Sequence, residues 1–257
     1  MLNASQAWIT TLTNVVNQGI ETAPRGKNTK ELIHQTTTFD MTSPVVNVAP
    51  RKMNYQFMAA EAYWILSGDN SVAGIAPYNK HIGQFSDNGV AFAGAYGPRI
   101  IAQLNYVVSK LAQDRDTRQA VLTIWNPNPA PSKDIPCTVA FAFQIRNNKL
   151  MTSVFMRSSD CWLGLPYDMF NFSMLSYLIC IRYNKTNNDK ISPGILNLTA
   201  ASSHLYEDHW ESARGCLGLE TLDPKPAPAE LWEDEDMLMR YLEELRNSKA
   251  DNPIRWW

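Results

Sequence analysis

The sequence predicts a mixed α+β fold in one domain. Several segments repeat apolar residues at helical spacing, and others are short β-branched runs bounded by prolines and polar turns. The 257 residues are 45% hydrophobic and 19% charged, which is ordinary for a globular protein and sufficient for a sizeable core. No internal repeat or low-complexity tract is visible. Helical and strand segments mixed along one chain in this way favour the α+β class.

Four helices are expected within residues 1–184, taken in chain order. The first covers residues 4–20, and the segment 22–32 after it contains Pro and Gly and is expected to be a loop. The second covers 53–69 and ends at a glycine, and the third covers 99–114. The fourth, 169–184, is apolar on nearly every face, which is typical of a buried helix. The apolar residues that repeat in the first helix are Trp8, Ile9, Leu12, Val15, Val16 and Ile20.

Strands are expected mainly in the second half of the chain. A β-branched run stopped by prolines occupies 118–127, and residues 137–160 form two strands joined by the polar turn Asn147-Asn148. Residues 194–216 begin as a strand and continue into a helix, whereas 76–98 are punctuated by Gly and Asn and are expected to form an extended loop.

The C-terminal part differs from the rest in composition. From Pro224 it has a Pro-rich linker, an acidic helix over 230–247 and the ending "NPIRWW". We nevertheless expect the whole chain, residues 1–257, to form a single domain.

Composition and charge restrict the classes of partner. The net charge of −2 and the pI of about 6.1 argue against bulk binding to nucleic acid, so a bound phosphate needs a few well-placed arginines. No run of about 18 apolar residues predicts a membrane span, and the first residues lack the pattern of a signal peptide. The four cysteines form no CxxC pair and lie far from the histidines, so we expect no metal and free thiols in the cytoplasm.

Asp168 stands out because it lies in the apolar run "WLGLPYDMFNFSML". An unpaired buried carboxylate is costly, so such a residue is usually paired, protonated or functional. Glu61, inside the apolar helix "FMAAEAYWIL", raises the same question.

Other polar residues are ambiguous when each is taken alone. Cys137 after a proline is most simply a small buried residue. Arg157 and Ser158 in "MRSSD" suit an anion, although an ion pair with Asp160 is the simpler interpretation. The remaining candidates are the loop residue Arg25, the charged residue Arg118 at a strand start, and His204 and Tyr206, whose spacing on a strand points them the same way.

The order and spacing of these residues resemble the thymidylate synthase family over roughly residues 4–215. Its most specific motif, Arg-Ser-x-Asp-x-x-Leu-Gly-Leu-Pro-Phe-Asn, stands here as "RSSDCWLGLPYD", and its Pro-Cys-His nucleophile motif stands as "PCT". "EAYWILSGDN", "GAYGPRI" and "SSHLYEDH" resemble three further family segments in the same order. The tail over residues 224–257 does not match and is divergent.

The resemblance implies a fold with a mixed β-sheet at a homodimer interface, flanked by helices. It also implies that Cys137 is the nucleophile that adds to C6 of a pyrimidine nucleotide, activated by a neighbouring cation, for which Arg157 is the candidate. Glu61 is expected to order waters and move protons, and Tyr96 to help remove the C5 proton.

The resemblance further implies roles in binding the nucleotide. Its phosphate is expected to contact Arg25, Arg157 and Ser158, and Arg118 of the second subunit, although Gln119 stands where the family usually has another arginine. The sugar 3′-hydroxyl is expected to contact His204 and Tyr206.

The one-carbon donor implied by the resemblance is 5,10-methylenetetrahydrofolate. Asp160 is expected to contact its pterin ring, and Ile82 stands where the family has a tryptophan near the one-carbon unit. The family's C-terminus folds over the folate, and we assign that role to Trp257 in "NPIRWW".

Asp168 occupies the position at which the family reads the base with an asparagine. Cytosine reverses the donors and acceptors of the uracil edge, and a carboxyl group suits it because it accepts from N4 and, when protonated, donates to N3. Trp162, Leu163, Leu165 and Tyr167 beside it are expected to raise the pKa of Asp168. The sequence therefore favours dCMP as the substrate.

Three further departures, Ile82, Thr138 and Ser202, resemble the phage-type deoxycytidylate hydroxymethylases. In these, water completes the reaction and gives 5-hydroxymethyl-dCMP. The alternatives are a dCMP methyltransferase that takes hydride from the folate, and a dUMP-specific thymidylate synthase. A cysteine hydrolase using Cys137 and His204 leaves the arginines unexplained, and a folate- or nucleotide-binding regulator needs no nucleophile.

Overall fold

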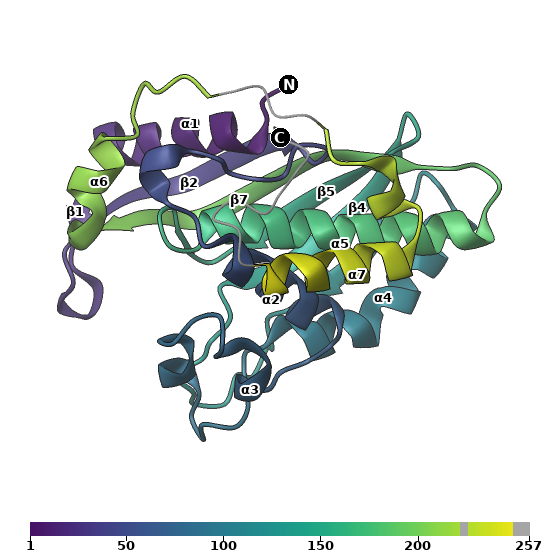
Figure 1. Ribbon diagram of the computed structural model, residues 1–257, viewed down its shortest axis with the longest axis horizontal. Helices are drawn as coiled ribbons and strands as arrows, with labels where there is room; N and C mark the ends of the chain where they lie inside the picture. Colours follow the sequence, from purple (N-terminus) through teal and green to yellow (C-terminus); the bar gives the residue numbers. More distant parts are fainter. Residues whose placement is uncertain (222–225, 249–257) are drawn as a thin grey trace.

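A seven-stranded mixed β-sheet forms the back of the molecule (Figure 1). The computed structural model describes residues 1–221 and 226–248. The strand order is β1-β2-β7-β5-β4-β3, with β6 paired to β7 beside this path. β7 runs parallel to β5 and β6, and the other pairs are antiparallel, which confirms the expected mixed sheet. The strands are β1 (Ile20–Thr22), β2 (Thr29–Asp40), β3 (Val121–Thr123), β4 (Thr138–Arg146), β5 (Lys149–Met156), β6 (Ser159–Asp160) and β7 (Ser192–Tyr206).

Helices cover the sheet in successive layers (Figure 1). α1 packs against β2 and β7, α5 against β5 and β7, and α4 against β3 and β4; α2 lies on α4 and α5, and α7 lies on α2. The α-helices are α1 (Ala4–Gln18), α2 (Tyr55–Leu66), α3 (Val72–Ile75), α4 (Tyr96–Gln113), α5 (Leu165–Thr186), α6 (Trp210–Arg214) and α7 (Glu235–Asn247). Short 3₁₀ helices are η1 (Pro24–Gly26), η2 (Ala49–Arg51), η3 (Ile82–Phe85), η4 (Glu207–His209) and η5 (Ala229–Trp232).

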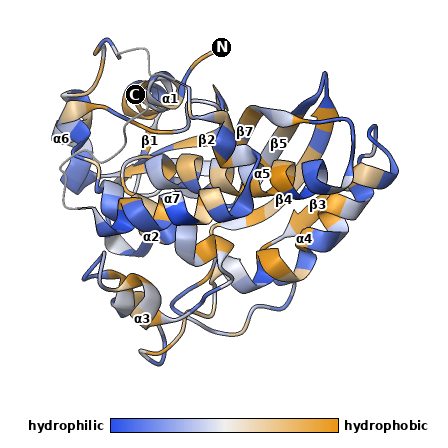
Figure 2. Ribbon diagram, turned by 45° about the vertical axis from the view of Figure 1, so that its right-hand side comes forward, coloured by the Kyte–Doolittle hydropathy of each residue, from blue (hydrophilic) through white to orange (hydrophobic). Residues whose placement is uncertain are grey.

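The main core lies around α5, which is buried along nearly its whole length as its apolar sequence predicts. Figure 2 shows the hydrophobic residues along this helix and the more hydrophilic surface of α7 outside it. Two buried hydroxyl pairs join the helical layer to the sheet, Thr11 with Thr37 at 2.7 Å and Thr152 with Ser176 at 2.8 Å. These four hydroxyl groups therefore satisfy one another in pairs.

β2 is the largest difference from the sequence-based expectation. The segment 22–32 was expected to be a loop, but only its first part is, and Thr29 begins a twelve-residue strand paired with β7. The buried face of this strand includes Thr37, whose hydroxyl is paired with Thr11. Because a threonine occupies a core position, the hydrophobic alternation that marks a half-buried strand is weak here.

Other elements differ from the expectation mainly at their ends. The helix expected from residue 99 begins at Tyr96, and the strand expected over 118–127 contracts to β3. The acidic helix begins at Glu235, where Asp234 accepts a hydrogen bond from the Met237 N–H as its N-cap. Of the linker expected from Pro224, residues 224 and 225 lie outside the described residues, and 226–228 lead into η5.

The sheet face turned away from the helices carries small and polar residues with a few apolar ones. Phe155, which is 45% exposed, pairs in register with Ala140 and Thr199. Thr199 in turn shares a hydrogen bond of 2.9 Å with Thr36 on β2. We call this surface, defined by Thr36, Ala140, Phe155 and Thr199, the open sheet face.

Candidate active site

Cys137 is placed by the hairpin that joins β4 and β5. Its turn residues Asn147 and Asn148 have φ of 52° and 58°, as in the tight turns whose twist suits a hairpin. The hairpin sets the first residue of β4 opposite Met156 and brings Cys137 next to Ser158. The Ser158 hydroxyl donates to the thiol at 3.6 Å. Cys137 is partly exposed, whereas the other three cysteines are buried.

Arg157 braces the backbone that leads to Cys137. Its Nε donates to the carbonyl of Pro136 at 3.0 Å, and Nη2 donates to that of Ile135 at 2.9 Å. Its Nη1 lies 3.3 Å from the Ser158 hydroxyl. The alternative of an ion pair with Asp160 does not occur: the Arg157 guanidinium donates to the two carbonyls, and Oδ1 of Asp160 accepts from two backbone N–H groups of the following turn.

Tyr96 reaches the same place from the first turn of α4. Its hydroxyl accepts a hydrogen bond from the Thr138 N–H at 3.1 Å. Burial, together with the charges of Asp168 and Cys137, raises the pKa of Tyr96 well above its usual range. The phenol is therefore protonated at neutral pH.

Glu61 projects from the middle of α2 toward α5. Its Oε2 accepts a hydrogen bond of 2.7 Å from Nδ2 of Asn171. Burial raises the pKa of Glu61 to about 7, and the Asn171 amide opposes part of that rise. Glu61 thus exchanges its proton near neutral pH, which is what a general acid or base requires.

Asp168 lies in the first turn of α5 and faces other acids. Burial, followed by the charges of Glu61 and Asp160, raises the pKa of Asp168 well above its usual range. The expected direction is confirmed, but the two neighbouring carboxylates contribute to it as well as the apolar run. Among the described residues, no side chain donates a hydrogen bond to Asp168, so its carboxyl group is left for another partner.

His204 and Tyr206 lie near Asp160 because β6 pairs with the end of β7. Asp160 is in register with His204, whose carbonyl accepts from the Cys161 N–H at 2.8 Å. The rings of His204 and Tyr206 meet edge to face with centroids 5.2 Å apart, so the two side chains point the same way as expected.

An open cavity of about 740 Å³ lies at Tyr206. Arg25 contributes from η1, where it has a φ of 54°, Phe85 contributes from η3, and Leu163 from the turn before α5. Phe85 and Leu163 are 50% and 51% exposed, so both present apolar surface to solvent there. The full lining is Arg25, Gly26, Lys27, Asn28, Gln84, Phe85, Leu163, Tyr206, Glu207, Asp208 and His209.

The contacts thus connect most of the site residues expected from the sequence. Direct contacts, charge interactions or strand register join Cys137, Arg157, Ser158, Tyr96, Asp168, Glu61, Asp160, His204 and Tyr206, and the cavity adds Arg25.

Three expected residues are not joined to this group. Arg118 is exposed ahead of β3 and contacts none of these residues. Ile82 packs against the core in η3, the helix whose Gln84 and Phe85 line the cavity. Trp257 lies outside the described residues.

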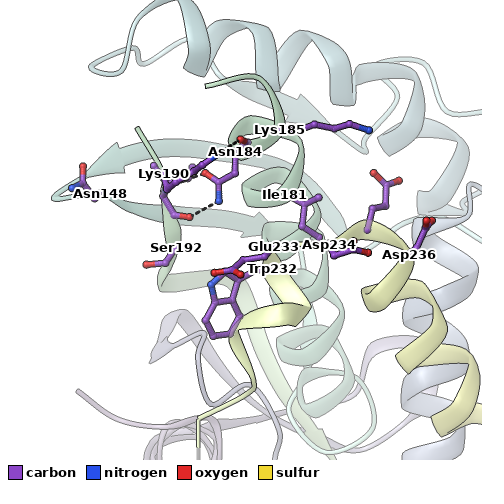
Figure 3. Close-up of a pocket in the computed structure, with 12 residues that line it drawn as sticks. Asn148, Ile181, Asn184, Lys185, Lys190, Ser192, Trp232, Glu233, Asp234 and Asp236 are labelled. Carbon is purple, nitrogen blue, oxygen red and sulfur yellow. Dashed lines mark hydrogen bonds between the residues drawn. The ribbon is translucent and has the colours of Figure 1, made fainter. Parts of the chain in front are cut away.

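A second cavity, of about 900 Å³, lies at the opposite end of α5. Figure 3 shows around it Asn184 and Lys185 of α5, Lys190 of the following loop, and Trp232, Glu233, Asp234 and Asp236 of the C-terminal segment. Arg182 and Glu235 form an ion pair of 2.9 Å beside it. None of the residues expected in the site lines this cavity.

Asn171 is the site residue that the sequence reasoning missed. It lies on α5 three residues after Asp168, and residues at that spacing share one face of a helix. An amide in an otherwise apolar helix, one turn from an acid, was the signal that could have identified it.

The described residues contain no group of three or more His, Cys, Asp or Glu side chains placed to hold a metal ion. Among the helices in the described part of the chain, none is both long and apolar enough to cross a membrane.

Two comparisons with known proteins found matches. A deoxyuridylate hydroxymethyltransferase of Bacillus phage SP01 is 36% identical over 182 residues, which are 62% of this chain and 47% of that protein. The matched part therefore spans about half the length of this relative. The family model for thymidylate synthase matches residues 6–236, so the likeness extends beyond residue 215 into the start of α7. The chain belongs to the thymidylate synthase family, whose enzymes transfer a one-carbon unit from methylenetetrahydrofolate to a pyrimidine nucleotide.

Proposed function

We propose that this protein hydroxymethylates dCMP at C5, using methylenetetrahydrofolate and a covalent bond between Cys137 and C6. The observation that carries the proposal is Asp168, an acid beside two other acids at the position where the family reads the base. Its raised pKa favours the protonated form of this carboxyl group.

A protonated carboxyl group complements the edge of cytosine. Its carbonyl oxygen accepts from the N4 amino group, and its O–H donates to N3. Uracil presents a carbonyl at position 4 and an N–H at position 3, so the same pair of contacts is reversed. Buried polar groups left unpaired in this way reject the wrong base strongly.

The same proton assists the first chemical step. The thiolate of Cys137 adds to C6, electrons move toward N3, and Asp168 donates its proton there. Ser158 donates to the sulfur at 3.6 Å and orients it. Arg157 holds the Cys137 backbone through the two preceding carbonyls. Addition makes C5 nucleophilic.

Glu61 and Tyr96 carry out the proton transfers that follow the addition to C6. Glu61, with a pKa of about 7, takes up and returns protons near the base. Tyr96 is held as a phenol, so it acts as a relay rather than as a phenolate: its oxygen accepts the C5 proton while its O–H passes a proton to a solvent water.

The phosphate and the sugar are assigned to the cavity and its margin. Arg25, Arg157 and Ser158 bind the phosphate, and His204 and Tyr206 bind the 3′-hydroxyl. Arg118 is exposed and contacts none of these groups within its own subunit. We therefore assign it to the phosphate of a second subunit in a homodimer formed through the open sheet face.

The residues around the cavity suit a folate. Phe85 and Leu163 offer exposed apolar surface near Asp160, whose Oδ1 accepts from the turn while Oδ2 accepts no hydrogen bond within the described residues. That oxygen is available to a pterin N–H, and Ile82 lies in the helix beside the cavity. When bound, the folate supplies a one-carbon unit at the oxidation level of formaldehyde.

Water rather than hydride is proposed to complete the reaction. Ile82 is smaller than the family's tryptophan and leaves room near the one-carbon unit. Thr138 and Ser202 replace two further family residues, and Thr138 Oγ1 is buried without a hydrogen bond in the described residues. The name of the phage relative, a hydroxymethyltransferase, supports this outcome.

Hydroxymethylation of dUMP is the second candidate, because the relative is named for deoxyuridylate. It requires an acid to serve where the family uses an asparagine, and Asp168 argues against it. We also propose that the chain forms one domain over 1–257 and acts in a host cytoplasm, the compartment suited to four free thiols and to a relative from a phage.

The test is folate-dependent tritium release from C5 of dCMP and of dUMP. We expect the wild type to prefer dCMP, and Asp168→Asn to shift the preference toward dUMP by at least about tenfold, because the base-edge contacts reverse. Cys137→Ala is the control and should release no tritium. A wild type that prefers dUMP, or an Asp168→Asn variant with unchanged preference, would contradict the proposal.

A further inference from the structure

Asn171 has a buried side-chain amide whose NH₂ group makes a hydrogen bond and whose oxygen makes none among the described residues. The residue is 3% exposed, and its Nδ2 donates to Glu61 at 2.7 Å. Its Oδ1 is fully buried and has no hydrogen-bond partner among the described residues. An unpaired buried carbonyl of this kind carries a free-energy cost and needs an explanation.

The partner of this amide is a group that changes its protonation state near neutral pH. An ionised Glu61 can only accept, which suits the Asn171 N–H group seen in the structure. A protonated Glu61 has an O–H to donate, which suits the unpaired Oδ1. Rotation of the amide by half a turn exchanges these two groups, and Oδ1 has no existing bond to lose.

We propose that Asn171 is a positioning residue that holds the Glu61 carboxyl group in one place in both of its protonation states. It donates from Nδ2 to the carboxylate, and after an amide flip it accepts at Oδ1 from the carboxylic acid. The inference rests on the proposed function for the role of Glu61 in proton transfer.

An amide serves this purpose better than other side chains of its size. Leucine offers neither group, and aspartate offers only acceptors while ionised and adds a second charge. The bond to the carboxylate is charge-assisted and therefore stronger than the bond to the acid. Asn171 consequently favours the ionised form while still accommodating the protonated one.

The groups that face Glu61 are few. Asp168 interacts with it from α5, and Asp160 and Tyr96 interact with Asp168 in turn. On the α7 side, Arg246 lies over the ring of Tyr63, with its guanidinium carbon 3.8 Å from the centroid. The loop between α2 and α3 contributes Asp69, whose carboxylate accepts hydrogen bonds from the Ser71 N–H and hydroxyl. Asn171 is therefore the group in direct hydrogen-bond contact with Glu61.

The test is a titration of the Glu61 carboxyl by ¹³C NMR in the substrate-free protein, with Glu61→Gln used to assign the signal. Asn171→Leu should move the titration upward by about one pH unit, because a hydrogen bond to the ionised form is lost. Asn171→Asp should move it further upward, because it adds a like charge. An unchanged titration in both variants would overturn the proposal.

Activity supplies a second readout. In Asn171→Leu, the acidic limb of the kcat/KM profile should move upward with the titration. kcat at pH 7 should fall about 10- to 100-fold, with a small change in the nucleotide KM, because Glu61 is no longer oriented. If neither dCMP nor dUMP reacts, the proposed function fails, while the NMR titration still decides the role of Asn171.

Asn184→Leu is the matched control. Asn184 is a second buried asparagine on α5, bonded to the backbone of Ile191 in both directions at 2.8 Å. Its loss should lower the free energy of unfolding and leave the Glu61 titration unchanged. If Asn171→Leu behaves in the same way, Asn171 is only structural and the proposal is wrong.

Discussion

Two carboxyl groups on neighbouring helices have different chemical assignments because their surroundings differ. Glu61 has an amide donor at 2.7 Å, which partly offsets the cost of burial. Asp168 has no such donor among the described residues and faces two acids. These surroundings favour the protonated form of Asp168 and partly stabilise the ionised form of Glu61, which agrees with the acid role proposed for Asp168 and the base role proposed for Glu61.

The raised pKa of Glu61 has a consequence for stability. The folded protein binds the Glu61 proton more tightly than the unfolded chain, so this stabilisation is complete below pH 4.5 and is lost as the pH rises through about 7. Glu61→Gln removes the dependence. We expect the variant to match the wild type at pH 4.5 and to exceed its free energy of unfolding by about 1–3 kcal/mol at pH 8.

Urea unfolding of both proteins at the two pH values measures this difference. The lower part of the range is expected, because Glu61 keeps some surface exposed to solvent. Equal stabilities at pH 8 would show that burial does not penalise the Glu61 carboxylate.

At the scale of elements, the sequence predicted the helices and strands that have a strongly periodic hydrophobic pattern. The amphipathic α1, the apolar α5 and the β4–β5 hairpin all occur where they were expected, because each has a regular hydrophobic pattern or a tight polar turn. The hairpin alone brings Cys137 to Ser158, so this part of the site followed from local sequence.

The elements that the sequence did not predict are held by tertiary contacts. β2 buries a threonine whose partner is on α1, with only Phe39 as an apolar residue beside it on that face, so its own sequence indicates the core face weakly. Similarly, the role of Asn171 depends on its hydrogen bond to Glu61, which lies more than a hundred residues away on α2. The pairing of β6 with β7, which sets Asp160 beside His204, is also invisible in a local pattern.

For the whole molecule, the family resemblance predicted a mixed sheet flanked by helices, and the structure shows which contacts hold the helices on the sheet. The helices lie on one face of the sheet, and the open sheet face carries Phe155 exposed among small and polar residues. We propose that a dimer forms through this face and brings Arg118 to the second subunit; Arg118 is exposed and contacts no site residue of its own subunit.

Mixing two inactive variants tests this assembly. Arg118→Ala and Cys137→Ala homodimers each lack one necessary group in both sites, whereas a mixed dimer has one complete site. After random exchange of equal amounts, about a quarter of the wild-type activity should return. Activity that stays at the level of the separate variants would show that Arg118 acts within its own subunit or not at all.

The central claim is that water completes a folate-dependent addition to dCMP. Mass spectrometry of the nucleotide formed from dCMP and methylenetetrahydrofolate in water enriched with heavy oxygen tests it most directly. We predict 5-hydroxymethyl-dCMP with the heavy isotope in its hydroxyl group and no rise in absorbance from dihydrofolate. Formation of 5-methyl-dCMP with dihydrofolate, or a product from dUMP alone, would contradict it.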